Sequence, residues 1–181
     1  MGLVFVLLLM AACGQLETQA PQAGRLEASW AGADTGKISA YAAAEWCADR
    51  LSLEIRAIQG DTGLALALYP VDTIVSDSYR VVAPSPADSA PPSASVALRL
   101  FGKTAIKGYQ GDSGTVILER SGSGQLSGSL AARARSVQGG EQVRLSGKFD
   151  RVAIMPQERG CAPRPPDTSA DTTEDGEPLH D

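Results

Sequence analysis

Histidine is almost absent from this chain, since its one copy, His180, is the penultimate residue of 181. A catalytic site that uses histidine as a general base, such as a Ser-His-Asp triad, therefore has no candidate in the body of the chain. Three cysteines and one histidine also argue against a zinc site. No glycine-rich loop opens a helical segment, so a nucleotide cofactor has no support. We expect no cofactor and no resident metal.

An excess of charge of one sign is also lacking over most of the chain. The sequence has 16 basic and 21 acidic residues, and residues 162–181 hold one and six of these, which leaves fifteen of each in residues 1–161. A neutral domain lacks the positive charge that binds phosphate backbones, which argues against a nucleic-acid partner. Residues 162–181 are acidic and rich in proline and threonine, and we expect them to form a disordered tail.

The apolar run at the N-terminus is too short for a membrane-spanning helix. Leu3–Ala12 has ten residues, whereas a spanning helix needs about twenty and a signal-peptide core roughly seven to fifteen. It ends in Met10-Ala11-Ala12-Cys13. This motif resembles the bacterial lipobox, in which small residues precede the cysteine that receives the lipid.

The resemblance to bacterial lipoproteins implies a location. Residues 1–12 would be a cleaved signal peptide, Cys13 would be acylated and anchored in the membrane, and residues 13–25 would form a tether. Gly14 stands where an inner-membrane retention signal would place Asp, so resemblance to enteric lipoproteins implies the outer membrane of the cell envelope. Met1-Gly2 lacks the basic residues of an export signal, which a translation start a few codons upstream would explain. The alternative is an apolar strand that ends in a cysteine by chance.

Two cysteines remain once Cys13 is acylated. Cys47 and Cys161 form an even pair, and exported proteins fold in an oxidising compartment. We expect a disulfide between them, which would close a loop of order 100 residues and stabilise the fold by roughly 4–5 kcal/mol in the chain-entropy model. The alternative is two unpaired thiols.

Residues 27–156 are expected to be strands joined by short turns. Leu51–Ala57 alternates apolar and polar residues, as a half-buried strand does. The turn Gly60–Gly63 leads into Leu64–Tyr69, which is apolar on both faces. Gly111–Gly114 is interpreted as another such turn, because Gly and Asp supply the backbone geometry that tight hairpins need.

The segment Lys37–Cys47 has two interpretations. Its alanine run suits a helix, but its apolar residues alternate and favour a strand. Successive hairpins without helices then predict an all-β domain, an antiparallel meander that forms a small barrel or sandwich. The domain spans residues 26–161, and the Pro/Ser-rich residues 83–94 are expected to be a solvated loop within it.

Three motifs match protease signatures. Gly111-Asp112-Ser113-Gly114 matches the serine-protease nucleophile motif, while Asp34-Thr35-Gly36 and Asp61-Thr62-Gly63 match the aspartic-protease triplet. The first needs a histidine, and the second needs two lobes that bring two carboxylates together. We therefore interpret all three as turns and expect no catalytic residues. Calcium between Asp61 and Asp112 remains an alternative, as does a hydrolase that uses Asp and Ser without His.

The C-terminal half carries a second resemblance. Gly114–Leu118 (GTVIL), Leu126–Leu130 (LSGSL) and Leu145–Val152 (LSGKFDRV) look like the small uncharacterised bacterial lipoproteins with the pattern GxVxL…isGtF…GxF..V. Leu130 replaces the usual Phe of that pattern. The resemblance implies a β-hairpin fold and an envelope location, and it implies no catalytic residue.

These patterns predict a non-enzymatic, lipid-anchored envelope protein whose β domain presents a surface to an envelope protein partner. The alternative is a lipocalin-like barrel that carries a small apolar ligand. That ligand cavity would be lined by apolar side chains from the middle and the end of the domain: Leu64, Leu66, Leu68, Ile117 and Phe149. A positively charged face is expected if the basic residues of the last two long strands share one side: Arg133, Arg135, Arg144, Lys148 and Arg151.

Overall fold

The computed structural model describes residues 24–48, 50–83 and 91–155, and every regular element among them is a β-strand. The strands are β1 (Arg25–Gly32), β2 (Gly36–Cys47), β3 (Ser52–Gln59), β4 (Thr62–Tyr69), β5 (Asp77–Val81), β6 (Ser93–Phe101), β7 (Ile106–Arg120), β8 (Leu126–Ser136), β9 (Gln142–Val152) and β10 (Ile154–Met155). The all-β prediction is confirmed, and the segment Lys37–Cys47 lies within strand β2.

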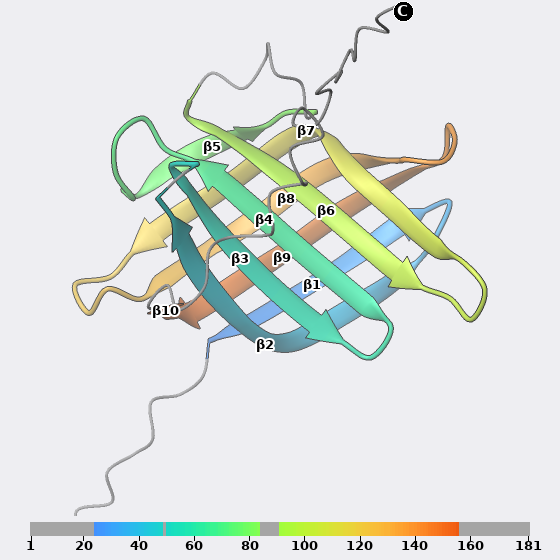
Figure 1. Cartoon of the computed structure of the whole chain (residues 1–181), viewed down its shortest axis with the longest axis horizontal. Coiled ribbons are helices and arrows are strands. Elements are labelled where there is room, and N and C mark those ends of the chain that lie inside the picture. The colour runs from blue at the N-terminus through green and yellow to red at the C-terminus, as the bar shows by residue number, and fades with distance from the viewer. Residues whose placement is uncertain (1–23, 49, 84–90, 156–181) are drawn as a thin grey trace, which may run out of the picture.

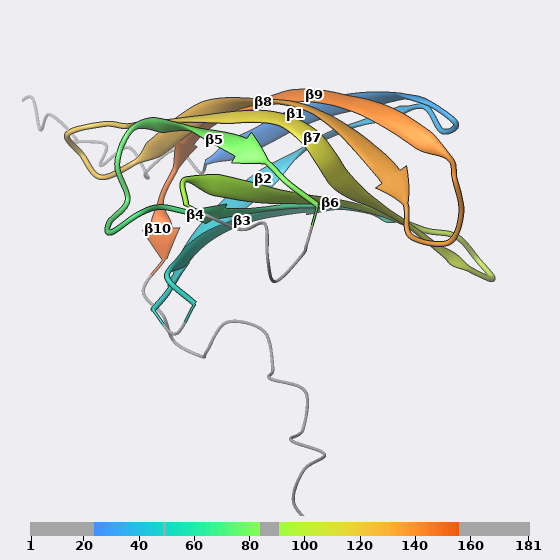
Figure 2. The same cartoon turned by 90° about the horizontal axis from the view of Figure 1, so that it is seen from above.

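The strands close into a barrel. Each long strand pairs with its neighbours in the order β1-β9-β8-β7-β5-β6-β4-β3-β2, and β1 then pairs with β2 to complete the ring (Figure 1). The closing contact places Ala28 between Ile38 of β2 and Gly147 of β9. Closure leaves no unpaired edge among the long strands, which settles the choice between barrel and sandwich. Viewed from above, the barrel is flattened, with β1, β9, β8, β7 and β5 over β2, β3, β4 and β6 (Figure 2).

Two short strands depart from the antiparallel pattern. β5 runs parallel to the start of β6 and lies between β6 and β7 at one end of the barrel, whereas β6 and β7 pair directly at the other end. β10 pairs in parallel with the last part of β2. β5 and β10 therefore both add strand pairing at the end of the barrel where β2 ends and β6 begins.

Different parts of the chain lie at the two ends of the barrel. The turns that join β1 to β2, β3 to β4, β6 to β7 and β8 to β9 lie together on the right of Figure 1, and we call this the hairpin end. Gly24 and Ala153 both accept hydrogen bonds from the last part of β2, from Ala42 and Ala44. The described chain thus begins and ends at the opposite side, which we call the terminal end.

The predicted turn at Gly111–Gly114 is wrong. β7 continues through these residues as one strand of 15 residues, and its pairing with β8 shifts register between Gly111 and Ser113. The extra residue makes a β-bulge at Asp112, and Gly114 has a φ of +126° that other residues rarely adopt. The bulge lets β7 pair with β6 on one side of it and with β5 on the other.

The expected loop 83–94 ends earlier than predicted, because β6 begins at Ser93.

Candidate functional site

The predicted cavity residues divide between the inside and the outside of the barrel. Leu64, Leu66, Leu68 and Phe149 are buried in one hydrophobic cluster that fills the interior. Ile117 is 46% exposed on the outer surface, so its assignment to a cavity is wrong. Its neighbours in β7, Val116 and Leu118, occupy the interior positions, and alternation along a strand then directs Ile117 outward.

The interior is packed too tightly at three levels to accept even an added methyl group. A Cβ on Gly128 would lie 2.5 Å from the ring of Phe149, and a Cβ on Gly111 would lie 2.8 Å from a methyl group of Val81. Towards the hairpin end, a Cβ on Gly36 would overlap the indole of Trp30. Side chains of adjacent strands therefore pack closely against one another at these levels, and the buried apolar cluster occupies the space that the strands enclose, as in other small barrels.

A polar cluster lies at the hairpin end. The buried Tyr109 donates its hydroxyl hydrogen to Asp34 in the β1–β2 turn, and Lys107 Nζ lies 3.2 Å from Asp34 Oδ2. Glu141 Oε2 is 3.4 Å from the same hydroxyl. The hydrogen bond from Tyr109 lowers the pKa of Asp34 below its usual value, while burial, aided by the bond to Asp34, raises the pKa of Tyr109. The cluster ties β7 to two turns of the hairpin end.

The residues of the protease-like motifs make local contacts within the barrel wall and its turns. Ser113 donates to the neighbouring Asp112 at 2.9 Å, and Asp112 Oδ2 lies 3.5 Å from Arg135. Asp61 lies in the turn between β3 and β4, whereas Asp112 is part of the bulge within β7, so the expected pair of turns does not form. In the part of the chain that the structure describes, no three acidic, His or Cys side chains form a metal-binding group. His180 lies outside the described residues.

Of the three cysteines, the structure describes one. Cys47 is fully buried at the end of β2. Cys13, the expected lipidation site, and Cys161, the expected disulfide partner, lie outside the described residues, so both assignments remain predictions. Among the described residues no helix has the length and hydropathy to cross a membrane.

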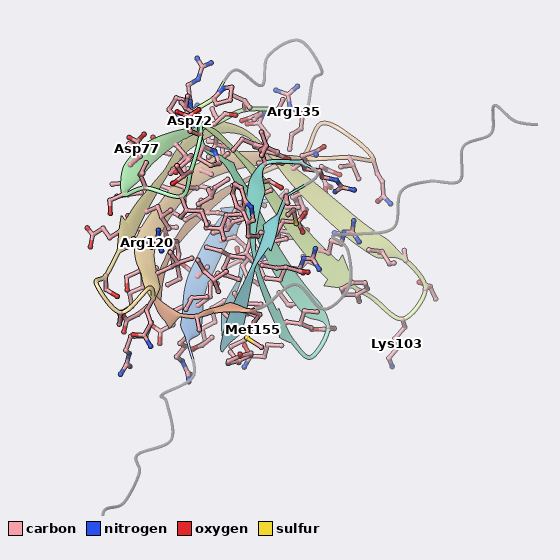
Figure 3. All side chains as sticks on the ribbon, turned by 60° about the vertical axis from the view of Figure 1, so that its left-hand side comes forward. Asp72, Asp77, Lys103, Arg120, Arg135 and Met155 are labelled. Atoms are coloured by element: carbon pink, nitrogen blue, oxygen red, sulfur yellow. The ribbon has the colours of Figure 1, made fainter. Side chains whose placement is uncertain are left out.

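The basic residues of β8 and β9 lie on the outer surface, and three of them have acidic neighbours. Arg135, which projects from the barrel in Figure 3, lies near Asp112. Lys148 lies 3.5 Å from Glu27 Oε2, and Arg151 pairs with the adjacent Asp150 at 2.9 Å. These three cations are therefore partly compensated.

Arg133 and Arg144 differ from the other basic residues. They are directly opposite each other on β8 and β9, both exposed, and neither has an ion-pair partner among the described residues. Lys37 on β2, which the sequence analysis did not single out, is likewise exposed and without an ion pair in the described ranges. Like charges that face each other across a strand pair destabilise a sheet. The face therefore has positive charge that the described residues do not neutralise.

This charge borders a groove on the outer surface of β8, β9, β1 and β2. Three adjoining hollows of about 240, 650 and 470 Å³ form it. The first and second share Ala31 and Arg144, and the second and third share Ser29, Lys37 and Ser146. We call this the β1 groove. Six of its residues define it, small or hydroxylated along the middle of β1 and cationic at its sides: Ser29, Ala31, Lys37, Arg133, Arg144 and Ser146. The far end of the third hollow also contains Glu27, whose Oε2 lies 3.5 Å from Lys148.

Sequence reasoning identified part of this groove. The positions of Arg133 and Arg144 on the last two long strands predict a basic face if the two residues share one side. Ser29 and Lys37 were missed because they belong to β1 and β2, about one hundred residues earlier, and only ring closure brings β1 beside β9. Comparison of the chain with protein-family models, with curated proteins and with solved structures found no match.

Proposed function

We propose that the chain is a non-enzymatic, lipid-anchored protein of the bacterial cell envelope whose barrel presents its outer surface to a partner. The observation that carries this proposal is the contrast between the two sides of the barrel wall. The inside is filled by apolar side chains, while the outside has a groove with uncompensated cations. Binding at the outer surface needs no internal cavity.

The lipocalin-like alternative needs space inside the barrel. Ligand sites of that kind have volumes of roughly 300–1,000 Å³. At the levels of Gly128, Gly111 and Gly36, neighbouring side chains already occupy the position of an added Cβ. The packed interior therefore favours a partner-binding module over a carrier.

The anchoring part of the proposal is supported by the lipobox motif and by the position of the first described residue. Gly24 lies at the terminal end, where its carbonyl accepts a hydrogen bond from Ala42. Gly24 follows Cys13 by eleven positions, and such a segment spans at most about 40 Å. A lipid on Cys13 would thus hold the terminal end within this distance of the membrane, which we propose to be the outer membrane.

The anchor is tested by expressing the chain with its native upstream region and measuring the intact mass of detergent-extracted protein. We expect a mature chain that begins at an acylated Cys13, and we expect Cys13→Ser to abolish the added mass and the membrane association. Recovery of unmodified chain that retains Met1 would contradict the anchoring.

The choice between partner module and carrier is tested by titration with a fluorescent fatty-acid analogue. We expect no saturable binding by the full chain. Saturable binding at one site that Leu66→Trp abolishes would establish the carrier instead, because Leu66 is buried in the middle of β4.

A further inference from the structure

We propose that the β1 groove binds an anionic polysaccharide, with Arg133, Arg144 and Lys37 holding its acidic groups. This inference deepens the proposed function, because it names the chemistry of the partner at the outer surface. Three features of the groove carry it: its uncompensated charge, its hydroxyl groups and its length.

The charge indicates an acidic ligand. Arg133 and Arg144 face each other across β8 and β9, and no acidic side chain lies between them in the register of the two strands. Ala31 follows on β1, opposite Arg144, so this row of the groove has two guanidinium groups and a methyl side chain. Guanidinium groups bind carboxylate, sulfate and phosphate through paired hydrogen bonds. An anion between the two arginines would replace their repulsion with attraction.

The hydroxyl groups indicate a sugar. Ser29 and Ser146 are cross-strand partners in the middle of the groove, with their Oγ atoms 3.3 Å apart. Ser39 lies beyond them and is already hydrogen-bonded, since its Oγ accepts from Arg25 at 3.0 Å and donates to Glu27 at 3.4 Å, so the pair Ser29 and Ser146 carries this feature. Serine hydroxyls both donate and accept, as sugar hydroxyls do. The small side chains of Ser29, Ala31 and Ser146 also leave room for a ring above the strands.

The length indicates a polymer rather than a single ion. The groove extends along β9 from Gln142 to Lys148, and six residues of strand span about 20 Å. Trp30, the aromatic residue among those that line the groove, is only 6% exposed and packs against Gly36. Single-stranded nucleic acids need exposed aromatic side chains on which bases stack. Acidic groups on a sugar chain fit this lining better than a nucleic acid does.

The test uses the full chain in neutral detergent and measures binding to immobilised polygalacturonate and dextran sulfate, with uncharged dextran and single-stranded DNA as comparison polymers. We expect the wild-type chain to bind one or both acidic polysaccharides, to bind neither comparison polymer, and to bind more weakly as salt is raised.

Two double variants separate the groove from the general charge of the surface. Arg133→Ser with Arg144→Ser removes the facing pair, and we expect binding to weaken at least tenfold. Arg80→Ser with Arg99→Ser removes two exposed cations from β5 and β6, on strands away from the groove, and we expect a change below twofold. Ser29→Ala with Ser146→Ala keeps the charge and removes two hydroxyls, and we expect a loss of twofold to fivefold.

Equal losses from the two arginine pairs would overturn the proposal, because they would indicate attraction to the whole surface. Binding of DNA in preference to the polysaccharides would also overturn it. A wild-type chain that binds neither polysaccharide would overturn the proposal as well. This outcome includes the case in which residues 162–181 or a second copy of the chain occupy the groove. Thermal melts of each variant confirm folding. The assay does not use the anchor, so a failed anchoring test and a failed binding test remain distinguishable.

Discussion

Tyr109 on β7 donates its phenolic hydrogen to Asp34, 75 residues earlier in the turn between β1 and β2. The phenol ring is buried, and its hydroxyl contacts the carboxylate at the hairpin end of the barrel. Lys107 Nζ lies 3.2 Å from the same carboxylate. A hydrogen bond to a charged group contributes about 1.5–3 kcal/mol. This hydrogen bond therefore links β7 to the β1–β2 turn and stabilises the closed barrel.

Tyr109→Phe removes the hydroxyl and keeps the ring. We expect a loss of about 1–2 kcal/mol at pH 7. The pKa of Asp34 is lowered in the folded protein, first by the Tyr109 hydrogen bond, so the stabilisation is present above the usual Asp pKa and is lost as pH falls through the lowered value. Urea denaturation at pH 7 and at pH 3 measures the difference. A gap between wild type and variant that stays constant at both pH values would contradict the role of the ionised Asp34.

The same tyrosine predicts an alkaline transition. Burial, together with Asp34 and Glu141, raises the pKa of Tyr109, so its ionisation opposes folding. Stability that is complete below the ordinary tyrosine pKa, about 10, should decrease as pH rises above it towards the raised value. Burial and Asp77 also raise the pKa of Tyr79, so absorbance titration near 295 nm should show two fewer tyrosines ionising near pH 10 in the wild type than in the unfolded chain. Tyr109→Phe should remove one of the two late steps.

Gly111→Ala tests the packed interior. The added methyl group would meet a methyl group of Val81 at 2.8 Å and the Cβ of Val96 at 3.1 Å, and overpacking of this kind costs about 1–3 kcal/mol or more. Gly122 in the turn after β7 has nothing within 4 Å of its Cβ position, so Gly122→Ala is the control and should change stability by less than about 0.5 kcal/mol. Equal thermal midpoints for the two variants would show that the barrel has unfilled space.

The expected disulfide is consistent with the path of the chain at the terminal end. Met155 pairs with Glu45, two residues from Cys47, and the six residues from Met155 to Cys161 span at most about 20 Å. Non-reducing peptide mapping should find Cys47 linked to Cys161. Reduction or Cys161→Ser should lower stability by up to about 4 kcal/mol. Cys161→Ser is preferable to Cys47→Ser, because a hydroxyl at the fully buried position 47 would add a separate penalty. Recovery of both thiols free would contradict the pairing.

The tail is expected to be dispensable for folding. Residues 163–181 contain six acidic residues and four prolines, a composition that offers no apolar face to pack. A chain that ends at Ala162 should melt within about 2 °C of the full chain, which corresponds to less than about 1 kcal/mol. A decrease of about ten degrees would show that the tail contributes to the fold.

Strand positions were predictable because alternation and turn composition are local properties. The hairpin around Gly60 is where the sequence predicts it. The error at Gly111–Gly114 arose because a β-bulge and a hairpin turn favour the same residues, Gly and Asp. Ile117 lies in an unbroken apolar run, Val116–Leu118, and such a run does not show which side chains point inward, because that depends on the pairing with β8. A few neighbouring residues therefore do not distinguish a bulge from a hairpin turn, or an inward side chain from an outward one.

The groove and the hairpin-end cluster were less accessible to sequence reasoning. Asp34 was recognised only as part of a protease-like triplet, and its partner Tyr109 follows 75 residues later. The cationic residues of β8 and β9 are visible in the sequence, but Ser29 on β1 and Lys37 on β2 join them only because β1 pairs with β9. Such sites depend on contacts between the first and last strands, which no local pattern specifies.

That closure also determines when the protein can fold. Ala28 on β1 meets Ile38 within a local hairpin, but its other partner, Gly147, belongs to the last long strand. A chain interrupted before residue 142 would leave β1 and β8 with unpaired edges, which are prone to aggregate. The slow step is therefore the joining of strands far apart in sequence. During synthesis, the barrel can close only after β9, which ends at Val152, has fully emerged.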